Sequence, residues 1–279
     1  MIPYVELPHL SLPFHQKIDL FGVVSTIGVV TGAALAIREA KKYAPGDDRP
    51  VNETIPWLVG GGLIGGHFMH IFAYHPEVLD GDPLVVLRVW EGLSSTGGML
   101  GAMIGLFISF WRMKEPILPH IDALALGTAP GWAIARIGCF LVHDHPGVPT
   151  DFFLAVNFPP SMGGPRHDLG LYDFFVLAVI TGILWTLKKK RPQQGRLMGV
   201  LAVLYTPCRF FLDFLRASDL SFVDRRYAGL TPAQYVVIVL FGIGVWLLTR
   251  KSADAVLKEV RVDKAEAKTY TPRRKQKGA

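Results

Sequence analysis

The stretch LYDFFVLAVITGILWTLKKKR, residues 171–191, decides the fold. Residues 171–187 are almost all apolar, and as a helix they are about long enough to cross the roughly 30 Å of hydrocarbon in a bilayer. Four basic residues follow directly. Because basic connections stay on the cytoplasmic side of a membrane, the segment predicts a membrane-spanning helix that ends at the cytoplasm.

Similar apolar runs recur along the whole chain. Half of the 279 residues are hydrophobic and 19% are charged, a balance that argues against an ordinary soluble domain. The other runs are residues 20–37, 57–74, 97–111, 121–142, 197–215 and 232–248, of which 97–111 is the shortest and rich in glycine. We therefore predict an all-α integral membrane protein with about seven transmembrane helices.

Charge predicts the orientation. Most of the 29 lysine and arginine residues lie in alternate connections and after the last apolar run, which predicts an N-terminus outside and a C-terminus in the cytoplasm. Residues 1–18 lack the basic start of a signal peptide, so no cleavage is expected. Residues 1–249 are expected to form one transmembrane domain. Residues 250–279 are expected to be a disordered basic tail near lipid head groups, not a nucleic-acid-binding segment.

Two arginines fall inside predicted spans. At 1.5 Å per residue, Arg136 lies about 22 Å and Arg209 about 18 Å from the cytoplasmic boundary. Ionisable residues at such depth are costly and usually mark a site. A guanidinium group is well shaped to hold a phosphate. The similar depth of the two arginines predicts a shared anion site in the outer half of the membrane.

Together with Arg216 these arginines number three, and acidic residues at this depth are fewer. Arg209, Asp213 and Arg216 are spaced to share one helix face, which predicts an Arg209–Asp213 pair. Asp173, at the outer start of the next predicted span, is a candidate partner for Arg136. Salt bridges alone remain an alternative, but the excess of arginines favours a bound anion.

Glycine clusters have two interpretations. The run GGGLIGG at residues 60–66 lies within a predicted span, where glycines four apart allow two helices to approach closely. Gly97 and Gly98 follow the hydroxyl-bearing residues 94–96 at a predicted helix start. That start is expected either to be an ordinary capped terminus or to bind an anion through free N–H groups.

Histidines gather toward the predicted outer side of the membrane: His67, His70, His75, His143, His145 and His167. Metal binding, proton transfer and structural packing are all open to them, although their spacing fits no zinc signature. The cysteines, Cys139 and Cys208, lie within predicted spans and suggest neither a disulfide nor a cysteine-based zinc site. We predict no metal and no cofactor.

Four segments, taken in order, resemble the prolipoprotein diacylglyceryl transferase family. They are WEGLSSTGG at 90–98, ARIGCF at 135–140, RH at 166–167 followed by LYD at 171–173, and RFFLDFLRASD at 209–219. The resemblance implies transfer of a diacylglyceryl group from phosphatidylglycerol to the thiol of a prolipoprotein cysteine in the bacterial inner membrane. It also implies that Arg136 and Arg209 bind the phosphate and that Asp213 orients Arg209.

The remaining substrate-binding residues that the resemblance implies are Arg216, Gly97, Gly98, Tyr172, Asp173, Arg166 and His167. The sequence also departs from the family pattern. Thr96 stands at the family's histidine, Cys139 and Val142 at two asparagines, Asp144 at a glutamate, Phe21 at a tyrosine and His67 at an arginine.

The proton-handling part of the site is therefore altered. His143, Asp144 and His145 are predicted as replacement catalytic groups, with Thr96 at the position of the family's histidine. Two alternatives stay open: a phospholipid-binding relative without transfer activity, and a histidine-lined, metal-dependent membrane hydrolase or metal carrier.

Overall fold

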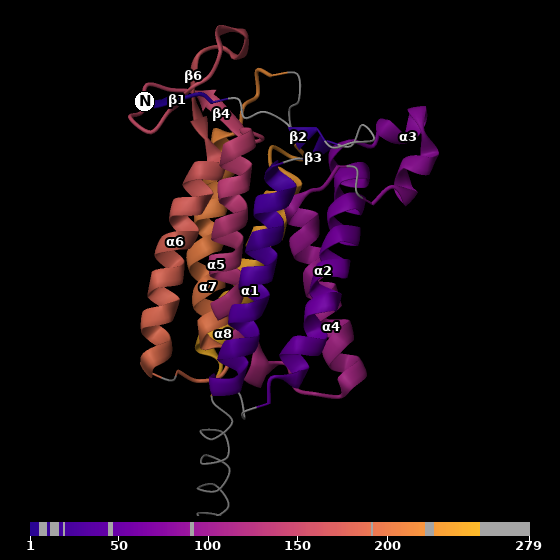
Figure 1. Cartoon of the computed structure of the whole chain (residues 1–279), viewed down its shortest axis with the longest axis vertical. Helices are drawn as coiled ribbons and strands as arrows, with labels where there is room; N and C mark the ends of the chain where they lie inside the picture. The colour runs from indigo at the N-terminus through magenta and orange to yellow at the C-terminus, as the bar shows by residue number, and fades with distance from the viewer. Residues whose placement is uncertain are drawn as a thin grey trace, which may run out of the picture. The chain divides into compact units, whose positions relative to one another are not determined.

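Long helices that run side by side make up most of the protein in this computed structural model (Figure 1). The structure describes residues 1–5, 10–11, 17–18, 20–43, 47–89, 92–190, 192–220 and 226–251. The long helices are α1 Leu20–Tyr43, α2 Arg49–Met69, α4 Ser95–Met113, α5 Leu118–Val142, α6 Leu169–Leu187, α7 Arg196–Leu212 and α8 Pro232–Thr249.

Six helical segments are long and apolar enough to cross a membrane: Leu20–Lys42, Arg49–Tyr74, Leu118–Val142, Leu169–Lys190, Arg196–Leu215 and Pro232–Thr249. They coincide with six of the predicted spans and confirm an all-α, multi-pass membrane protein. The seventh predicted span corresponds to α4, which packs along α2. Its crossing of the membrane, and the orientation of the chain, remain predictions.

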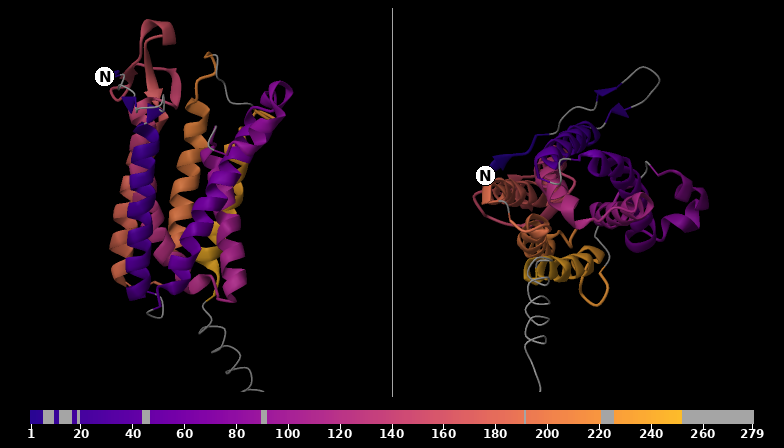
Figure 2. Two further views of the ribbon diagram at one scale, coloured as in Figure 1. Left: turned by 45° about the vertical axis from the view of Figure 1, so that its right-hand side comes forward. Right: turned by 90° about the horizontal axis from the view of Figure 1, so that it is seen from below.

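Glycines bring the helices of two pairs into backbone contact. A Cβ on Gly61 of α2 would lie 2.3 Å from the carbonyl oxygen of Gly101 of α4, so the predicted packing role of the 60–66 cluster is confirmed. The α1–α5 pair uses the same device, since a Cβ on Gly28 would lie 2.5 Å from the carbonyl oxygen of Gly131. Such close approach is how membrane helices gain packing energy. Figure 2 shows the helices from two further directions.

The core of the helical part lies where α5 meets α6 and α7. Leu126, Leu177, Leu184 and Leu197 are fully buried there. The start of α7 is fixed by a carboxylate from α5, because Asp122 accepts hydrogen bonds from the backbone N–H groups of Gly195, at 2.9 Å, and Met198, at 3.1 Å. These contacts hold α5 and α7, which carry the two predicted phosphate-binding arginines, in a fixed relation.

A small sheet covers one end of the helices (Figure 1). Its strands are β1 Ile2–Pro3, β4 Pro146–Pro149, β5 Val156–Asn157 and β6 Pro165–Asp168, in the order β1-β5-β6-β4. Only β1 and β5 pair in parallel. We call this the sheet end. The sequence did not predict these strands.

Short elements complete the chain. A second pair of strands is β2 Leu10–Ser11 with β3 Lys17–Ile18. The short helices are a π-turn η1 His70–Tyr74, α3 Val78–Gly81, and the 3₁₀ turns η2 Pro83–Leu87, η3 Pro160–Met162, η4 Lys188–Lys190 and η5 Asp213–Leu215. Residues Met1–Leu248 form one compact unit. The predicted disordered tail lies outside the described residues from position 252 onward.

Candidate active site

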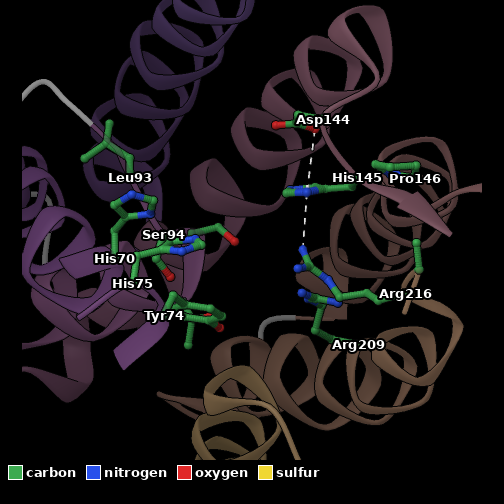
Figure 3. Close-up of a pocket in the computed structure, with 13 residues that line it drawn as sticks. His70, Tyr74, His75, Leu93, Ser94, Asp144, His145, Pro146, Arg209 and Arg216 are labelled. Carbon is green, nitrogen blue, oxygen red and sulfur yellow. Dashed lines mark hydrogen bonds and ion pairs between the residues drawn. The ribbon is translucent and has the colours of Figure 1, made fainter. Parts of the chain in front are cut away.

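A cavity of about 180 Å³ at the sheet end brings together residues from the segment after α5, from α7 and the segment after it, from the π-turn and from the start of α4 (Figure 3). Figure 3 places them in two groups that face each other. We call Asp144, His145, Arg209 and Arg216 the arginine wall, and His70, Tyr74, His75 and residues 94–96 the histidine wall. The sequence predicted all four residues of the first group as site residues and, of the second, Thr96.

One buried carboxylate organises the arginine wall. Asp213 Oδ1 pairs with Arg209 Nη1 at 2.8 Å and with Arg216 Nε at 3.2 Å. Its other oxygen accepts a hydrogen bond from the Thr231 hydroxyl. Asp213 is 1% exposed and Arg209 6%. The predicted Arg209–Asp213 pair is therefore confirmed, and Asp213 holds both guanidinium groups of this wall in place.

Arg136 lies in α5 behind the pocket and is not part of its lining. Its Nε is 3.3 Å from Asp173 Oδ2, which confirms Asp173 as its partner. Its Nη1 donates a long hydrogen bond to Cys139 Sγ, at 3.6 Å. Its Nη2 is buried without a hydrogen-bond partner among the described residues. Since an unsatisfied buried donor costs free energy, this atom is poised to bind an acceptor oxygen.

Guanidinium groups outnumber buried carboxylates around the site. The guanidinium groups of Arg136 and Arg209, both buried, and of Arg216, 18% exposed, share two buried carboxylates, those of Asp173 and Asp213. The further acid near them, Asp144, is 35% exposed. Taking an unbalanced positive charge out of water is costly. A monoanionic phosphate would bring the group of charges close to neutrality, and its oxygens would accept the available N–H groups.

His145 and Asp144 complete the arginine wall. His145 Nδ1 accepts a hydrogen bond from Arg216 Nη2 at 3.2 Å. Burial and the neighbouring arginines hold the pKa of His145 well below its ordinary value, so the ring is neutral at pH 7. Burial raises the pKa of Asp144 to about 6, even though Arg136 opposes this shift. Asp144 therefore changes charge close to neutral pH.

The geometry gives little support to the predicted metal-binding alternatives. Cys139, Asp144 and His145 each present a ligand atom within 4.8 Å of the others. However, Arg136 contacts the cysteine sulfur and Arg216 donates to the imidazole, and both positive charges disfavour a divalent cation there. Each ring nitrogen of His67 faces a backbone carbonyl oxygen. The guanidinium groups favour an anion at this site over a metal.

The histidine wall is built by the π-turn that ends α2. A backbone hydrogen bond of 2.9 Å from His75 N–H to His70 C=O closes a turn of five residues, so the two rings come to lie with their centroids 4.8 Å apart. π-Turns of this kind are frequent at functional sites. Both histidines were predicted to lie toward the outer side of the membrane, but not to line the site.

The start of α4 supplies the rest of this wall. The Ser94 hydroxyl accepts a hydrogen bond from Gly97 N–H at 3.3 Å, so this terminus is an ordinary capped one. Thr96 lines the pocket. Gly97 and Gly98 do not line it; a Cβ on Gly97 would lie 2.3 Å from the carbonyl oxygen of Gly65. Residues 90–91 of the predicted motif lie outside the described residues.

Two predicted site residues, Arg166 and His167, lie in β6, and Tyr172 lies in the first turn of α6; none of the three lines the pocket. Arg166 is buried and uses both terminal nitrogens to bind the carboxylate of Asp219, while Nη1 also donates to Gly147 C=O at 3.0 Å. His167 Nδ1 is 2.8 Å from the hydroxyl oxygen of Tyr172. Arg166 therefore ties the sheet to the segment after α7, and His167 ties it to α6.

His143 is also outside the pocket lining. It ends α5 in the left-handed conformation, with φ 51°. Its Nδ1 lies 2.8 Å from Asp168 Oδ2, and its ring stacks on Tyr4 with centroids 4.7 Å apart. The other Asp168 oxygen accepts from Leu171 N–H at 3.1 Å and caps α6. His143 thus joins the end of α5 to the start of α6.

Comparisons with known proteins agree on one family. A family model described as prolipoprotein diacylglyceryl transferase matches residues 9–250. A protein of Nitratidesulfovibrio vulgaris named phosphatidylglycerol–prolipoprotein diacylglyceryl transferase is 29% identical over 84% of this chain and 90% of its own length. Proteins with the same name from Roseobacter denitrificans, at 28% over 85% and 91%, and Polynucleobacter asymbioticus, at 31% over 70% and 75%, are also similar.

Proposed function

This chain belongs to the prolipoprotein diacylglyceryl transferase family, and on that premise we propose that it is a transferase acting on phosphatidylglycerol and a prolipoprotein cysteine. In this reaction the cysteine sulfur attacks the glycerol carbon that carries the phosphate. The carbon–oxygen bond breaks, its electron pair stays on the phosphate oxygen, and glycerol phosphate leaves. The product is a thioether between the cysteine and the diacylglyceryl group.

The observation that carries the proposal is the group of three guanidiniums that share two buried carboxylates. Arg209 and Arg216 reach the pocket, while Arg136 keeps an unpartnered N–H next to them in the same charged group. Donors that are fixed before the reaction stabilise charge as it develops on a leaving phosphate. Asp213 and Asp173 would keep the guanidiniums oriented for that task.

An apolar cavity supports a lipid substrate. It measures about 400 Å³ and lies between α1, α2, α4 and α5. Trp132 and Ala135, within one helical turn of Arg136, form part of its lining, and so does Gly98. A phospholipid would place its phosphate at the arginines and an acyl chain in this cavity, where the chain is shielded from water.

Charge supports a location in the bacterial inner membrane with the sheet end outside. Lys188–Lys190 lie at the opposite end of α6 from the sheet, as expected if that end faces the cytoplasm. The prolipoprotein cysteine would then reach the pocket from the outer side. Tyr172 and His167, near the sheet, would bind the peptide rather than the phosphate.

Complementation combined with an in vitro assay tests this function. We expect the wild-type chain to rescue a transferase-depleted bacterium and, in phosphatidylglycerol vesicles, to add a diacylglyceryl mass to a prolipoprotein-derived cysteine peptide. Arg209→Ala is expected to lower the transfer rate by about 10²- to 10³-fold, because one fixed donor to the phosphate is lost. Arg209→Lys should recover only part of it, since an ammonium lacks the planar fork.

Arg112→Ala is the matched control. Arg112 is exposed near the end of α4 opposite the pocket and lies over Trp57, with 5.6 Å from its guanidinium carbon to the ring centroid. The Arg112→Ala variant should transfer the diacylglyceryl group at the wild-type rate. Phosphatidylglycerol binding without any transfer by the wild-type chain would contradict the enzyme. It would favour the lipid-binding alternative, which Thr96 at the family's histidine position supports.

A further inference from the structure

The transfer reaction needs a group that removes the proton from the acceptor thiol, because a thiolate is the nucleophile and a free cysteine has a pKa of about 8.5. Within the described residues, the nitrogen and carboxylate bases that line the pocket are His70, His75, His145 and Asp144. The hydrogen bonds that these groups make indicate which of them can accept a thiol proton.

The arginine wall is poorly suited to this task. In neutral His145 one ring nitrogen carries a proton and the other has a lone pair. The lone pair of Nδ1 already accepts from Arg216 Nη2, so Nε2 carries the proton and cannot accept another. Asp144 is surrounded by the positive charges that hold the phosphate. A thiol that approached Asp144 would compete with the lipid head group for the same space beside the arginines.

The histidine wall has the opposite arrangement. His75 Nδ1 lies 3.1 Å from Glu77 Oε1, and a carboxylate at that distance accepts the Nδ1 proton. The lone pair then lies on Nε2. This is the orientation that a carboxylate imposes on a base histidine in hydrolytic triads. The His75 side chain is 33% exposed and lines the pocket, so it can exchange a proton with water.

The surroundings fix this histidine in place. The π-turn sets its backbone, and the neighbouring ring of His70 packs against Gly92, where an added Cβ would come within 2.3 Å of His70 Nε2. In Figure 3, His70 and His75 lie across the pocket from Arg209 and Arg216. A thiol that enters between the walls would have a base on one side and the phosphate on the other.

We propose that His75, oriented by Glu77, is the general base that removes the proton from the prolipoprotein thiol. The inference rests on the proposed transferase function. The thiol proton moves to His75 Nε2 as the sulfur–carbon bond forms, and the carbon–oxygen bond to phosphate breaks with its electrons leaving on the phosphate. The imidazolium then releases the proton to water. Glu77 is a positioning residue and does not touch the substrate.

The pH dependence of this step involves several charged groups. Those near His75 on its own side are His70, Tyr74 and Glu77, and those across the pocket are Asp144, His145, Arg209 and Arg216. Measurements at saturating phosphatidylglycerol remove the pH dependence of phosphate binding. The kcat/KM for the cysteine peptide then reports the groups that titrate before the peptide binds.

The test compares wild type, His75→Gln, Glu77→Gln and the control Asp80→Asn, each as the full chain in phosphatidylglycerol vesicles with the cysteine peptide. Asp80 is an exposed acid in α3, three residues from Glu77. We expect His75→Gln to lower kcat/KM at pH 7 by about 100-fold, the size of a general-base contribution. The deficit should shrink toward pH 9, where the thiol ionises without help. Glu77→Gln should lower kcat/KM at pH 7 a few-fold.

A second substrate makes the test independent of folding effects. A peptide with selenocysteine in place of cysteine is ionised at pH 7, so it should restore most of the His75→Gln rate if the base does nothing but remove a proton. An equal loss at every pH, or no rescue by selenocysteine, would overturn the assignment of His75 and leave the transferase intact. Absence of transfer by the wild-type chain would overturn both proposals.

Discussion

The two walls of the pocket are built in different ways. The arginine wall comes from the ends of long helices, and its central charges are almost completely buried, with Asp213 at 1% and Arg209 at 6% exposure. The histidine wall comes from a π-turn and the first turn of α4, and its His75–Glu77 pair is open to solvent at 33% and 65%. The centre of the arginine wall is buried, whereas the His75–Glu77 pair of the other side is in contact with water.

This difference matches two chemical tasks. Charges that stabilise a leaving phosphate act most strongly when they are oriented in advance and shielded from water. A base that turns over must instead return its proton to solvent after each cycle. The departures from the family pattern fall on both sides of the pocket: Thr96 lies in the histidine wall and Asp144 in the arginine wall. Arg209 and Arg216 nevertheless keep their shared carboxylate, Asp213.

The largest effect is expected from removing the charge that holds the arginine wall. Asp213→Asn leaves Arg209 and Arg216 without their shared carboxylate. Breaking a buried ion pair costs about 3–5 kcal/mol, and we expect transfer to fall about 10³-fold because both guanidiniums lose their orientation. Thermal unfolding in detergent and the peptide assay measure the two losses.

The control for this change is an ion pair in the exposed region next to the histidine wall. Asp82 pairs with Arg88, with side-chain exposures of 44% and 38%. Asp82→Asn should cost no more than about 1 kcal/mol, as for other surface pairs, with little change in transfer. Similar losses for Asp82→Asn and Asp213→Asn would contradict the distinction between a buried and a solvated wall.

The sequence predicted the arginine wall better than the histidine wall, and the reason is physical. Arg209 and Asp213 are one helical turn apart, so their pairing follows from helix geometry alone. Arg136 lies at a depth where a charge needs a partner, and few acids are available to it. Local spacing and membrane depth therefore identify this part of the site without a structure.

The rest of the site depends on contacts between residues far apart in the sequence, which local spacing does not predict. His143 and Arg166 were predicted to act in the site, but their partners Asp168 and Asp219 are 25 and 53 residues away, so their roles in joining helices and sheet were not visible. The strands of the sheet are only two to four residues long. The π-turn departs from regular helical spacing, and that departure pairs His70 with His75.

A smaller effect is expected at the backbone that supports the histidine wall. Gly92 has φ +67°, and a Cβ there would meet the His70 ring at 2.2 Å. Gly92→Ala should therefore displace both histidines and lower transfer about 10-fold, which is less than the 10²- to 10⁴-fold contribution of a positioned base. Phosphatidylglycerol binding should stay close to wild type, because the arginine wall is unchanged.

Gly81→Ala is the matched control. Gly81 ends α3, and an added Cβ would meet no atom within 4 Å. It should leave both binding and transfer unchanged. If Gly92→Ala weakened phospholipid binding as strongly as it slowed transfer, the two walls would not act separately.

The smallest effect is expected at Asp144, the group of the arginine wall that titrates near neutrality. Burial raises its pKa to about 6 because the charged form is disfavoured there. Below this pH the protonated carboxyl can donate a hydrogen bond to a phosphate oxygen, whereas above it the carboxylate repels the anion. Phosphatidylglycerol affinity should therefore fall by roughly 5-fold as the pH rises from 5 to 8.

Asp144→Asn, which keeps an uncharged donor, should bind phosphatidylglycerol with an affinity that no longer changes across this range. Titration with a short-chain phosphatidylglycerol would measure it. An affinity that rises with pH in the wild type would show that Asp144 is not a neighbour of the bound phosphate, and would confine anion recognition to the three arginines.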